Sequence, residues 1–261
     1  MRKNNKKITA AILIIGNEIL SGRTRDQNVA FLAGWLNDRL GIKIDEVRIV
    51  PDIEKKIISN ILILSKNYNY VLTTGGIGPT HDDITAKSIS KAFKKKYIFN
   101  KEALNILKKY YGNKNFNDPR KKMAKMPEGS RLIYNPSSAA PGFIIKNVIC
   151  LPGVPLILKS MIHNLQKYLK TGSKIYSLTI SVYTVESKIA KILEKIQLKY
   201  KKFIEIGSYP FFRLGKIGVS IVLRSENEKK LHYCHNEIVK ILKKTKLKFL
   251  KKYDFIFCIR K

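Results

Sequence analysis

The sequence predicts an α/β domain with a mostly parallel sheet, followed by a smaller α+β domain. Segments with strand and helix patterns alternate over residues 8–169, which is typical of a parallel sheet covered on both faces. The run Thr9–Ile15 is apolar apart from its first residue, as expected of a strand buried on both sides. After residues 170–173 the order changes to strand, helix, strand, strand, helix, strand. We therefore expect domains at 1–172 and 173–261.

Hydrophobic spacing and turn residues predict each element of the first domain. Apolar residues recur at helical spacing in segment 28–40 until Gly41 ends the pattern, and Pro155 suits the first turn of a late helix. In chain order we expect strands at 9–15, 42–50, 70–73, 131–134 and 142–151, and helices at 28–40, 51–65, 82–95, 101–111 and 155–169.

The second domain is predicted in the same way. We expect strands at 175–185, 203–208, 218–224 and 254–259, and helices at 186–200 and 228–244. The segment Gly215-Lys-Ile-Gly218 has the spacing of an RNA-clamping loop, but it lies between two predicted strands, so a hairpin turn is the favoured interpretation. No acidic residue here lies in a glycine turn that faces a phosphate, which predicts a role in assembly or substrate access.

Composition narrows the class of protein. The net charge of +32 comes almost entirely from lysines, spread over nearly every predicted helix, so we expect no specific nucleic-acid partner, only weak, salt-sensitive binding. No apolar run reaches the length of a membrane span, and no leader is recognised, which predicts a cytoplasmic protein without a membrane partner. Three widely spaced cysteines argue against a disulfide framework or a zinc ribbon, so any metal should have oxygen ligands.

The segment 71–85, VLTTGGIGPTHDDIT, is the most informative motif. It is interpreted as a strand end, a turn containing Gly75, Gly76 and Gly78, and a helix whose first turn carries Thr80, Asp82 and Asp83. Glycines let the backbone approach a ligand, and a helix start offers free N–H groups to an anion. Carboxylates repel a bare phosphate but bind a divalent cation that accompanies one, so the motif indicates a metal–phosphoester site with Asp82 and Asp83 as metal ligands. Alternatively, both aspartates only cap the helix.

Two further polar segments follow predicted strands and should share the same crevice, because the strand ends of a parallel sheet meet at one edge. Taken singly, each residue has a plain structural explanation, such as a helix cap or a βα turn. The candidate ligand-binding residues in these segments and in a nearby Pro-rich turn are Glu18, Ser21, Asp26, Asn28, Ser138, Pro152 and Gly153.

Several of these segments together resemble a known family. The chain contains, in order, AAILIIGNEILSGRTRDQN, VLTTGGIGPTHDDIT, MAKMPEGS, AAPGF and LPGVP. These motifs, over residues 8–170, are similar to the MoaB/Mog-like domain, named for molybdopterin binding, of competence/damage-inducible protein A (CinA). The later segments VESKIAKIL and GSYPFF resemble the KH-like region that follows it, and similar paired domains are fused to eukaryotic FAD synthases.

The resemblance implies a three-layer α/β/α domain that binds a nucleotide or pterin phosphate at the GGxGPTxDD crevice, in a homodimer or larger oligomer. Mog-type proteins adenylylate molybdopterin, whereas CinA-type domains are associated with metal-dependent hydrolysis of ADP-ribose or FAD. Asp83 corresponds to the acidic residue kept in Mog-type proteins, and Asp82 to the additional carboxylate of the CinA type. Asn17 replaces the usual aspartate of the first motif, which weakens metal binding there. The sequence does not include the deamidase domain of CinA, so we expect no deamidase activity.

Two functions remain open. The first is a pyrophosphatase that hydrolyses a nucleotide diphosphate such as ADP-ribose or FAD with Mg²⁺, Mn²⁺ or Co²⁺, using Asp82 and Asp83. The alternative is a protein that binds molybdopterin or a nucleotide without turnover, in cofactor handling. The sequence does not separate them, because the same cradle serves both.

Overall fold

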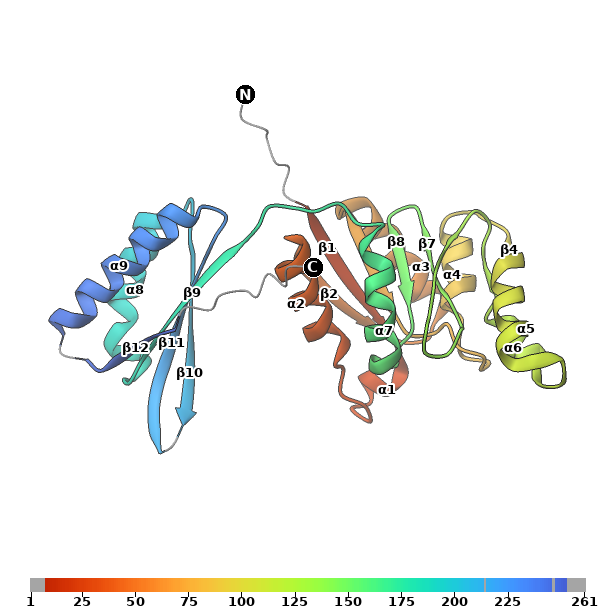
Figure 1. Ribbon diagram of the computed structural model, residues 1–261, viewed down its shortest axis with the longest axis horizontal. Helices are drawn as coiled ribbons and strands as arrows, with labels where there is room; N and C mark the ends of the chain where they lie inside the picture. Colours follow the sequence, from red (N-terminus) through yellow and green to blue (C-terminus); the bar gives the residue numbers. More distant parts are fainter. Residues whose placement is uncertain (1–7, 214, 246, 253–261) are drawn as a thin grey trace, which may run out of the picture. The chain divides into compact units, whose positions relative to one another are not determined.

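The computed structural model describes residues 8–213, 215–245 and 247–252, and it contains two compact units, Met1–Gly172 and Ser173–Lys261 (Figure 1). Within these described ranges, every helix is too short or too polar to cross a membrane.

The first unit is built on a six-stranded sheet with the order β2-β1-β3-β8-β7-β6. The first four of these strands are parallel, and β7 and β6 are antiparallel additions at one edge. The prediction of a mostly parallel sheet is therefore confirmed. The strands are β1 (Thr9–Ile15), β2 (Lys43–Val50), β3 (Tyr70–Thr74), β6 (Arg131–Ile133), β7 (Gly142–Ile145) and β8 (Val148–Leu151).

Helices cover both faces of this sheet, which makes three layers. Successive residues of β1 alternate between the two faces, so Ala11 and Leu13 join one apolar cluster while Ile12 and Ile14 join the other. Burial on both sides explains why this strand has an apolar run instead of alternation. The helices α2 (Asn28–Leu40) and α7 (Pro155–Gln166) cover one face, and α3 (Glu54–Asn67), α4 (Thr85–Ala92) and α5 (Lys101–Asn115) cover the other.

Several short elements differ from the prediction. The single strand expected at 142–151 is a hairpin of β7 and β8, which turns at Lys146, where φ is 52°, and Asn147. The side-chain amide of Asn147 anchors this turn by donating to the backbone oxygens of Ser65 and Tyr68. The elements α1 (Asn17–Leu20), β4 (Tyr97–Phe99), α6 (Asp118–Lys122) and β5 (Lys125–Pro127) were not predicted, because three to five residues are too few to show a hydrophobic period.

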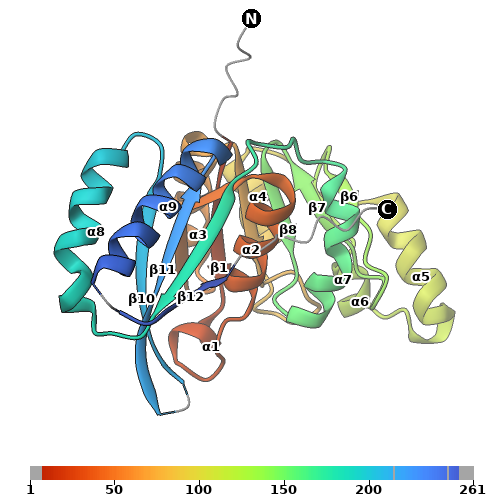
Figure 2. The ribbon, with the colours of Figure 1, turned by 60° about the vertical axis from the view of Figure 1, so that its left-hand side comes forward.

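The second unit is a two-layer α+β structure, as predicted. Its sheet has the order β10-β11-β9-β12 with antiparallel neighbours, and α8 and α9 cover one face (Figure 2). The Gly215–Gly218 segment belongs to the hairpin of β10 and β11, as expected. The strand expected at 254–259 lies outside the described residues. The elements are β9 (Tyr176–Val182), α8 (Glu186–Tyr200), β10 (Glu205–Arg213), β11 (Lys216–Ser225), α9 (Glu228–Lys244) and β12 (Phe249–Lys252).

Candidate functional site

A cleft of about 690 Å³ lies at the carboxyl ends of the parallel strands. Strand β1 lies between β2 and β3 in the sheet. The loop after β1 runs towards β2 and the loop after β3 runs the other way, so the two loops diverge between β1 and β3. Such a switch in strand order leaves a crevice in which open α/β sheets bind ligands. The loop after β8 closes a third side of the cleft.

The glycine turn after β3 is required by packing within the protein. Gly75 and Gly76 have φ values of 99° and 69°, which favour glycine. A Cβ atom on Gly75 would lie 2.1 Å from the carbonyl oxygen of Ile15, and one on Gly76 would lie 2.1 Å from Oγ1 of Thr85. The Thr85 hydroxyl also donates to the carbonyl of Gly75 at 3.0 Å. The turn is therefore fixed between β1 and α4.

The prediction that a helix begins near Thr80 is wrong. Helix α4 begins at Thr85, and residues 75–84 form an irregular loop. The backbone N–H of Thr80 donates to Oδ2 of Asp83 at 2.8 Å, so it is already paired and is not a free donor for a phosphate. The N–H of Thr85 donates to the carbonyl of Gly76 at 2.9 Å, so it does not make the bond to the carbonyl of residue 81 that a helix continuing from Thr80 requires.

Asp82 and Asp83 lie around one hydroxyl group. Oδ1 of Asp82 is 2.6 Å and Oδ2 of Asp83 is 2.5 Å from Oγ1 of Thr80. A hydroxyl has one proton to donate, so one of these two carboxylates faces an oxygen without a hydrogen bond. The hydrogen bond from Thr80 lowers the pKa of Asp82, and its own backbone N–H and the charges of His81 and Lys122 lower it further. Two carboxylates therefore lie close together at this turn.

Asp52, directly after β2, adds a further carboxylate to this region. Burial raises the pKa of Asp52, the N–H of Asn17 opposes this by donating to it at 2.9 Å, and the negative charges of Glu18, Asp82 and Asp83 raise it further. Sequence analysis did not include Asp52 as a site residue. Its position at the carboxyl end of the strand beside β1 was the available signal.

We expect Asp52→Asn to raise the melting temperature at neutral pH. A carboxyl whose folded-state pKa is raised above its usual 3.8 destabilises the folded protein when it ionises, and this penalty is absent below that usual pKa. Asparagine keeps an oxygen that accepts from Asn17. The gain should be much smaller near pH 3.5, where Asp52 is mostly protonated in both states. Asp38 is an exposed carboxylate on α2, so Asp38→Asn is the matched control in thermal melts at both pH values. A loss of stability at neutral pH would contradict the prediction.

The structure brings eight of the predicted residues together and leaves five outside the cleft. Those outside have local partners: Thr80 and Asp82 contact each other, the Ser21 hydroxyl donates to the carbonyl of Glu18, and Asp26 accepts from the N–H of Val29 in the first turn of α2. For Asp26, the structure shows the capping contact that was the alternative interpretation. The residues that line the cleft are Glu18, Gly75, Gly76, Gly78, Asp83, Ser138, Pro152 and Gly153.

Asn28, the fifth residue outside the lining, positions the loop after β8. It is 3% exposed, and its Nδ2 donates to the carbonyl of Gly153 at 2.8 Å. Its Oδ1 is buried without a hydrogen-bond partner, as is the hydroxyl of Thr74 at the end of β3. Buried unpaired oxygens are costly, and a bound water or ligand donor would satisfy them.

Replacing Asn28 tests this positioning. We expect Asn28→Ala to lower the free energy of unfolding by about 1 kcal/mol through the lost hydrogen bond. Asn28→Asp should cost more, at least about 2 kcal/mol, because a buried carboxylate would face the Gly153 carbonyl. Urea denaturation gives both values, with Asn37→Ala on the same helix as the control. Equal effects of the two Asn28 substitutions would show that the Gly153 contact is unimportant.

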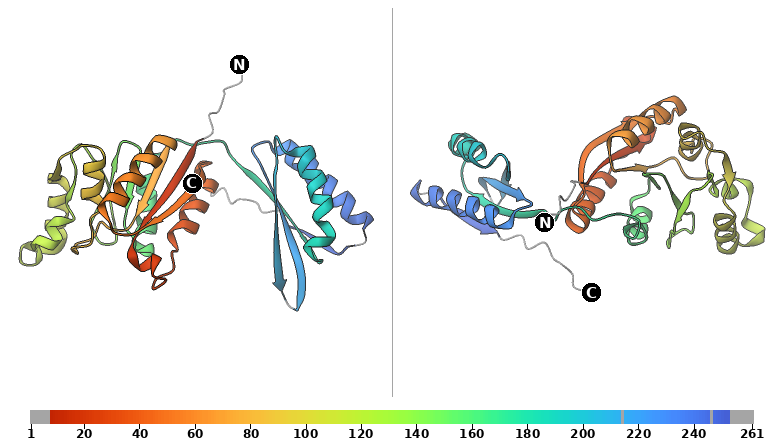
Figure 3. Two further views of the ribbon diagram at one scale, coloured as in Figure 1. Left: turned by 180° about the vertical axis from the view of Figure 1, so that it is seen from behind. Right: turned by 90° about the horizontal axis from the view of Figure 1, so that it is seen from above.

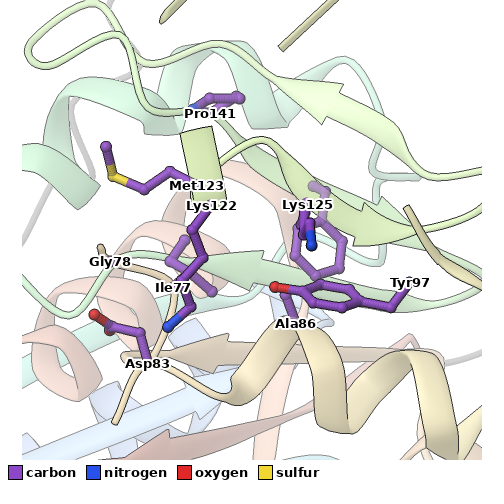
Figure 4. Close-up of a pocket in the computed structure, with 11 residues that line it drawn as sticks. Ile77, Gly78, Asp83, Ala86, Tyr97, Lys122, Met123, Lys125 and Pro141 are labelled. Atoms are coloured by element: carbon purple, nitrogen blue, oxygen red, sulfur yellow. The ribbon is translucent and has the colours of Figure 1, made fainter. Parts of the chain in front are cut away.

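The cleft also has a basic and aromatic wall that was not predicted from the sequence. Tyr111 and Arg120, from α5 and α6, line it, and the guanidinium of Arg120 lies 4.2 Å from the centre of the Tyr111 ring. Lys122 donates to the carbonyl of Thr80 and, with Asp83, lines a small cavity next to the cleft (Figure 4). In a lysine-rich sequence these residues carry no distinguishing signal, because only the fold places them at the strand ends.

The oxygen donors fit a hard divalent cation with few protein ligands. Within the described ranges, no group of three or more His, Cys, Asp or Glu side chains is arranged to hold a metal ion. Asp82, Asp83 and the Thr80 hydroxyl offer only oxygen atoms as ligands. The hydroxyl donates to one carboxylate at a time, so the other receives no hydrogen bond from it. Mg²⁺ is commonly held by one or two carboxylates, with water and substrate phosphates completing its shell. The set therefore fits an ion that arrives with a phosphate.

Comparison with known families identifies both parts of the chain. Residues 11–171 match the family described as probable molybdopterin binding domain, and residues 174–251 match the family described as FAD synthase, middle domain. A protein of Archaeoglobus fulgidus is 35% identical over 199 residues, which cover 76% of this chain and 84% of the relative.

Two further relatives have more informative names. A CinA-like protein of Fusobacterium nucleatum is 32% identical over 240 residues, covering 90% of this chain but only 57% of its own length. The crystal structure of the protein CinA, with unknown function, from Thermoplasma acidophilum matches with a TM-score of 0.58 and 32% identity, covering 62% of this chain and 99% of that one.

Proposed function

The chain belongs to the family of the probable molybdopterin binding domain, as it occurs in CinA-like proteins, and on this premise we propose that it hydrolyses the phosphoanhydride bond of a nucleotide diphosphate with a divalent cation. The observation that carries the proposal is that Asp83, the glycine turn and the Tyr111–Arg120 pair line one cleft. Its volume of about 690 Å³ falls within the range of pockets that enclose whole small-molecule ligands.

Each wall of the cleft has a separate task in this proposal. The backbone of Gly76 and Gly78 lies open to a diphosphate, and Arg120 supplies a permanent positive charge with a planar fork suited to phosphate oxygens. The ring of Tyr111 and the apolar side chain of Ile157 offer surfaces for a base or flavin ring.

The carboxylates complete the site. Asp82 and Asp83 would hold the cation, which supplies polarisation of the phosphoryl oxygens and a lowered pKa of a water molecule. Lys122, whose ammonium group lies at the carbonyl of Thr80, balances part of the negative charge of these carboxylates. Charge stabilisation of the bridging oxygens is the main source of acceleration in such a site.

The test is a substrate panel. The protein is incubated with ADP-ribose, FAD or NAD, each with Mg²⁺, Mn²⁺ or Co²⁺, and release of AMP is measured; molybdopterin, which contains no AMP, is tested for binding only. FAD is included because the second unit matches the middle domain of FAD synthase. We expect AMP from ADP-ribose or FAD, and none after chelation of the metal.

The second candidate is binding without turnover. It is favoured by the finding that no three metal-binding side chains converge within the described ranges. In this case calorimetry would detect binding of molybdopterin or a nucleotide at the cleft, while no combination in the panel would release AMP. A homo-oligomer is expected with either function, and sedimentation of the full chain measures it.

A further inference from the structure

The sheet of the second unit has one covered face and one open face. The apolar cluster of this unit lies between the sheet and the two helices α8 and α9. Figure 3 shows both helices on the same side of the strands. In the described ranges, the apolar core of this unit includes no residue from the opposite face, which we call the open face.

Strand register determines which side chains lie on the open face. Ile180, Val219 and Ile221 belong to the core on the helix side, so their neighbours along each strand point to the other side. Tyr209 pairs with Ser220, which pairs with Ser181, so these three residues form one row across the face. Large or charged side chains on the open face include Glu205, Tyr209, Phe211, Arg213, Lys216, Arg224 and Leu250.

Two aromatic rings lie over glycines on this face. A Cβ atom on Gly218 would lie 2.3 Å from the ring of Phe211, and one on Gly207 would lie 2.8 Å from the ring of Tyr209. The rings therefore cover backbone where neighbouring side chains are missing. Tyr209 remains 50% exposed, and Tyr183 contacts the edge of Phe211 with 6.0 Å between ring centres. An exposed ring and a partly exposed one therefore lie on this face.

The open face carries two arginines, Arg213 and Arg224. The second unit has 21 Lys and Arg against seven Asp and Glu, and nearly all of its basic residues are lysines. Both arginines among its described residues, Arg213 and Arg224, lie on the open face, and both are exposed. The guanidinium of Arg213 lies 5.2 Å from the centre of the Phe211 ring. Guanidinium groups stack on flat rings and pair with phosphates in a way that lysine does not.

We propose that the open face binds single-stranded nucleic acid, with bases stacked on Tyr209 and Phe211 and phosphates held by Arg213 and Arg224. Exposed rings among cations are the combination by which proteins bind single strands without reading their sequence. A second copy of the chain fits this face less well, because Arg213, Lys216 and Arg224 of the two copies would repel one another across it. A duplex fits less well because its bases are stacked internally and offer no free ring faces.

The experiment uses the full chain and a labelled oligonucleotide. Fluorescence anisotropy measures binding of an oligothymidine of about 12 nucleotides, near the site size of a single small binding domain. Tyr209→Ala should weaken binding by about fivefold or more, as expected for loss of one stacked base. Tyr233→Ala, an equally large aromatic that is 70% exposed on α9, is the matched control and should change affinity by less than about twofold.

Three results would overturn the proposal. The first is an equal effect of Tyr209→Ala and Tyr233→Ala, which would leave only diffuse electrostatic binding. The second is equal affinity for a duplex of the same length and for the single strand. The third is a change of mass in sedimentation caused by Tyr209→Ala, which would assign the open face to a second copy.

A measurement on the unaltered protein guards against misfolding of the variant. A photoreactive oligonucleotide is cross-linked to the full chain, and the modified peptides are identified by mass spectrometry. We expect cross-links in β10 and β11. Cross-links confined to α8 and α9 would also overturn the proposal. A protein that binds anionic vesicles but not the oligonucleotide would overturn it as well.

Discussion

Asp83→Asn is expected to reduce AMP release by at least about 100-fold, the usual effect of removing a group that stabilises charge in a transition state. Of the two paired aspartates, Asp83 is the one that lines the cleft. Asparagine retains an oxygen that accepts from the N–H of Thr80 at the same place. The loss of charge should therefore lower the free energy of unfolding by only about 1 kcal/mol. Rate and melting temperature are measured on the same preparation.

The paired variant Asp82→Asn separates the two aspartates. Asp82 contacts the Thr80 hydroxyl but does not line the cleft. Asp82→Asn should therefore raise the metal concentration needed for half-maximal AMP release more than it lowers the rate at saturating metal. Asp38→Asn is the control for loss of a surface charge. An Asp83→Asn protein that keeps the wild-type rate, or that melts far earlier, would make Asp83 a structural residue.

Gly75→Ala is expected to lower the free energy of unfolding by about 2–4 kcal/mol. This effect is large for a substitution that removes no contact. The φ of 99° at Gly75 is strained for alanine, and the added methyl group would meet the backbone oxygen of Ile15 at 2.1 Å. Because that atom belongs to β1, which is hydrogen-bonded to β2 on one side and to β3 on the other, it does not move freely. The site should be lost together with stability, since the turn forms one wall of the cleft.

Gly34→Ala is the matched control. Gly34 lies inside α2, and a Cβ atom there would have no heavy atom within 4 Å. This substitution should stabilise the protein by about 0.5–1 kcal/mol, because alanine loses less conformational freedom in a helix. Urea denaturation of both variants provides the comparison. If Gly75→Ala is as stable as the wild type, the turn is not held by its contact with β1.

The glycines of the turn after β3 line the cleft, as predicted, but the structure gives a different reason for glycine at these positions. Sequence analysis placed Gly75, Gly76 and Gly78 at the site because glycine lets a ligand approach the backbone. In the structure each glycine makes room for the protein itself: for Ile15, for Thr85 and for the carboxylate of Asp83, respectively. The requirement for glycine is real, but it arises from packing between β3, β1 and α4.

The sequence by itself determined the order and type of the long elements in both units. A helix such as α2 or a strand such as β1 is specified by the spacing of its own apolar residues, which is a local property of the chain. The same spacing predicted which loops follow parallel strands, and therefore which residues meet in the cleft. Glu18, Asp83 and Gly153 were found in this way.

Only the tertiary structure decided the rest. Arg120 and Lys122 belong to the site region because separate segments fold onto one edge of the sheet, and no local pattern distinguishes them from other charged residues. Helix α4 begins at Thr85 because the N–H of Thr85 donates to the carbonyl of Gly76, nine residues earlier, and not to the carbonyl of residue 81. Tyr209 and Phe211 share a face because α8 and α9 cover the other one. These features depend on contacts between residues far apart in the chain, which hydrophobic spacing and turn chemistry do not encode.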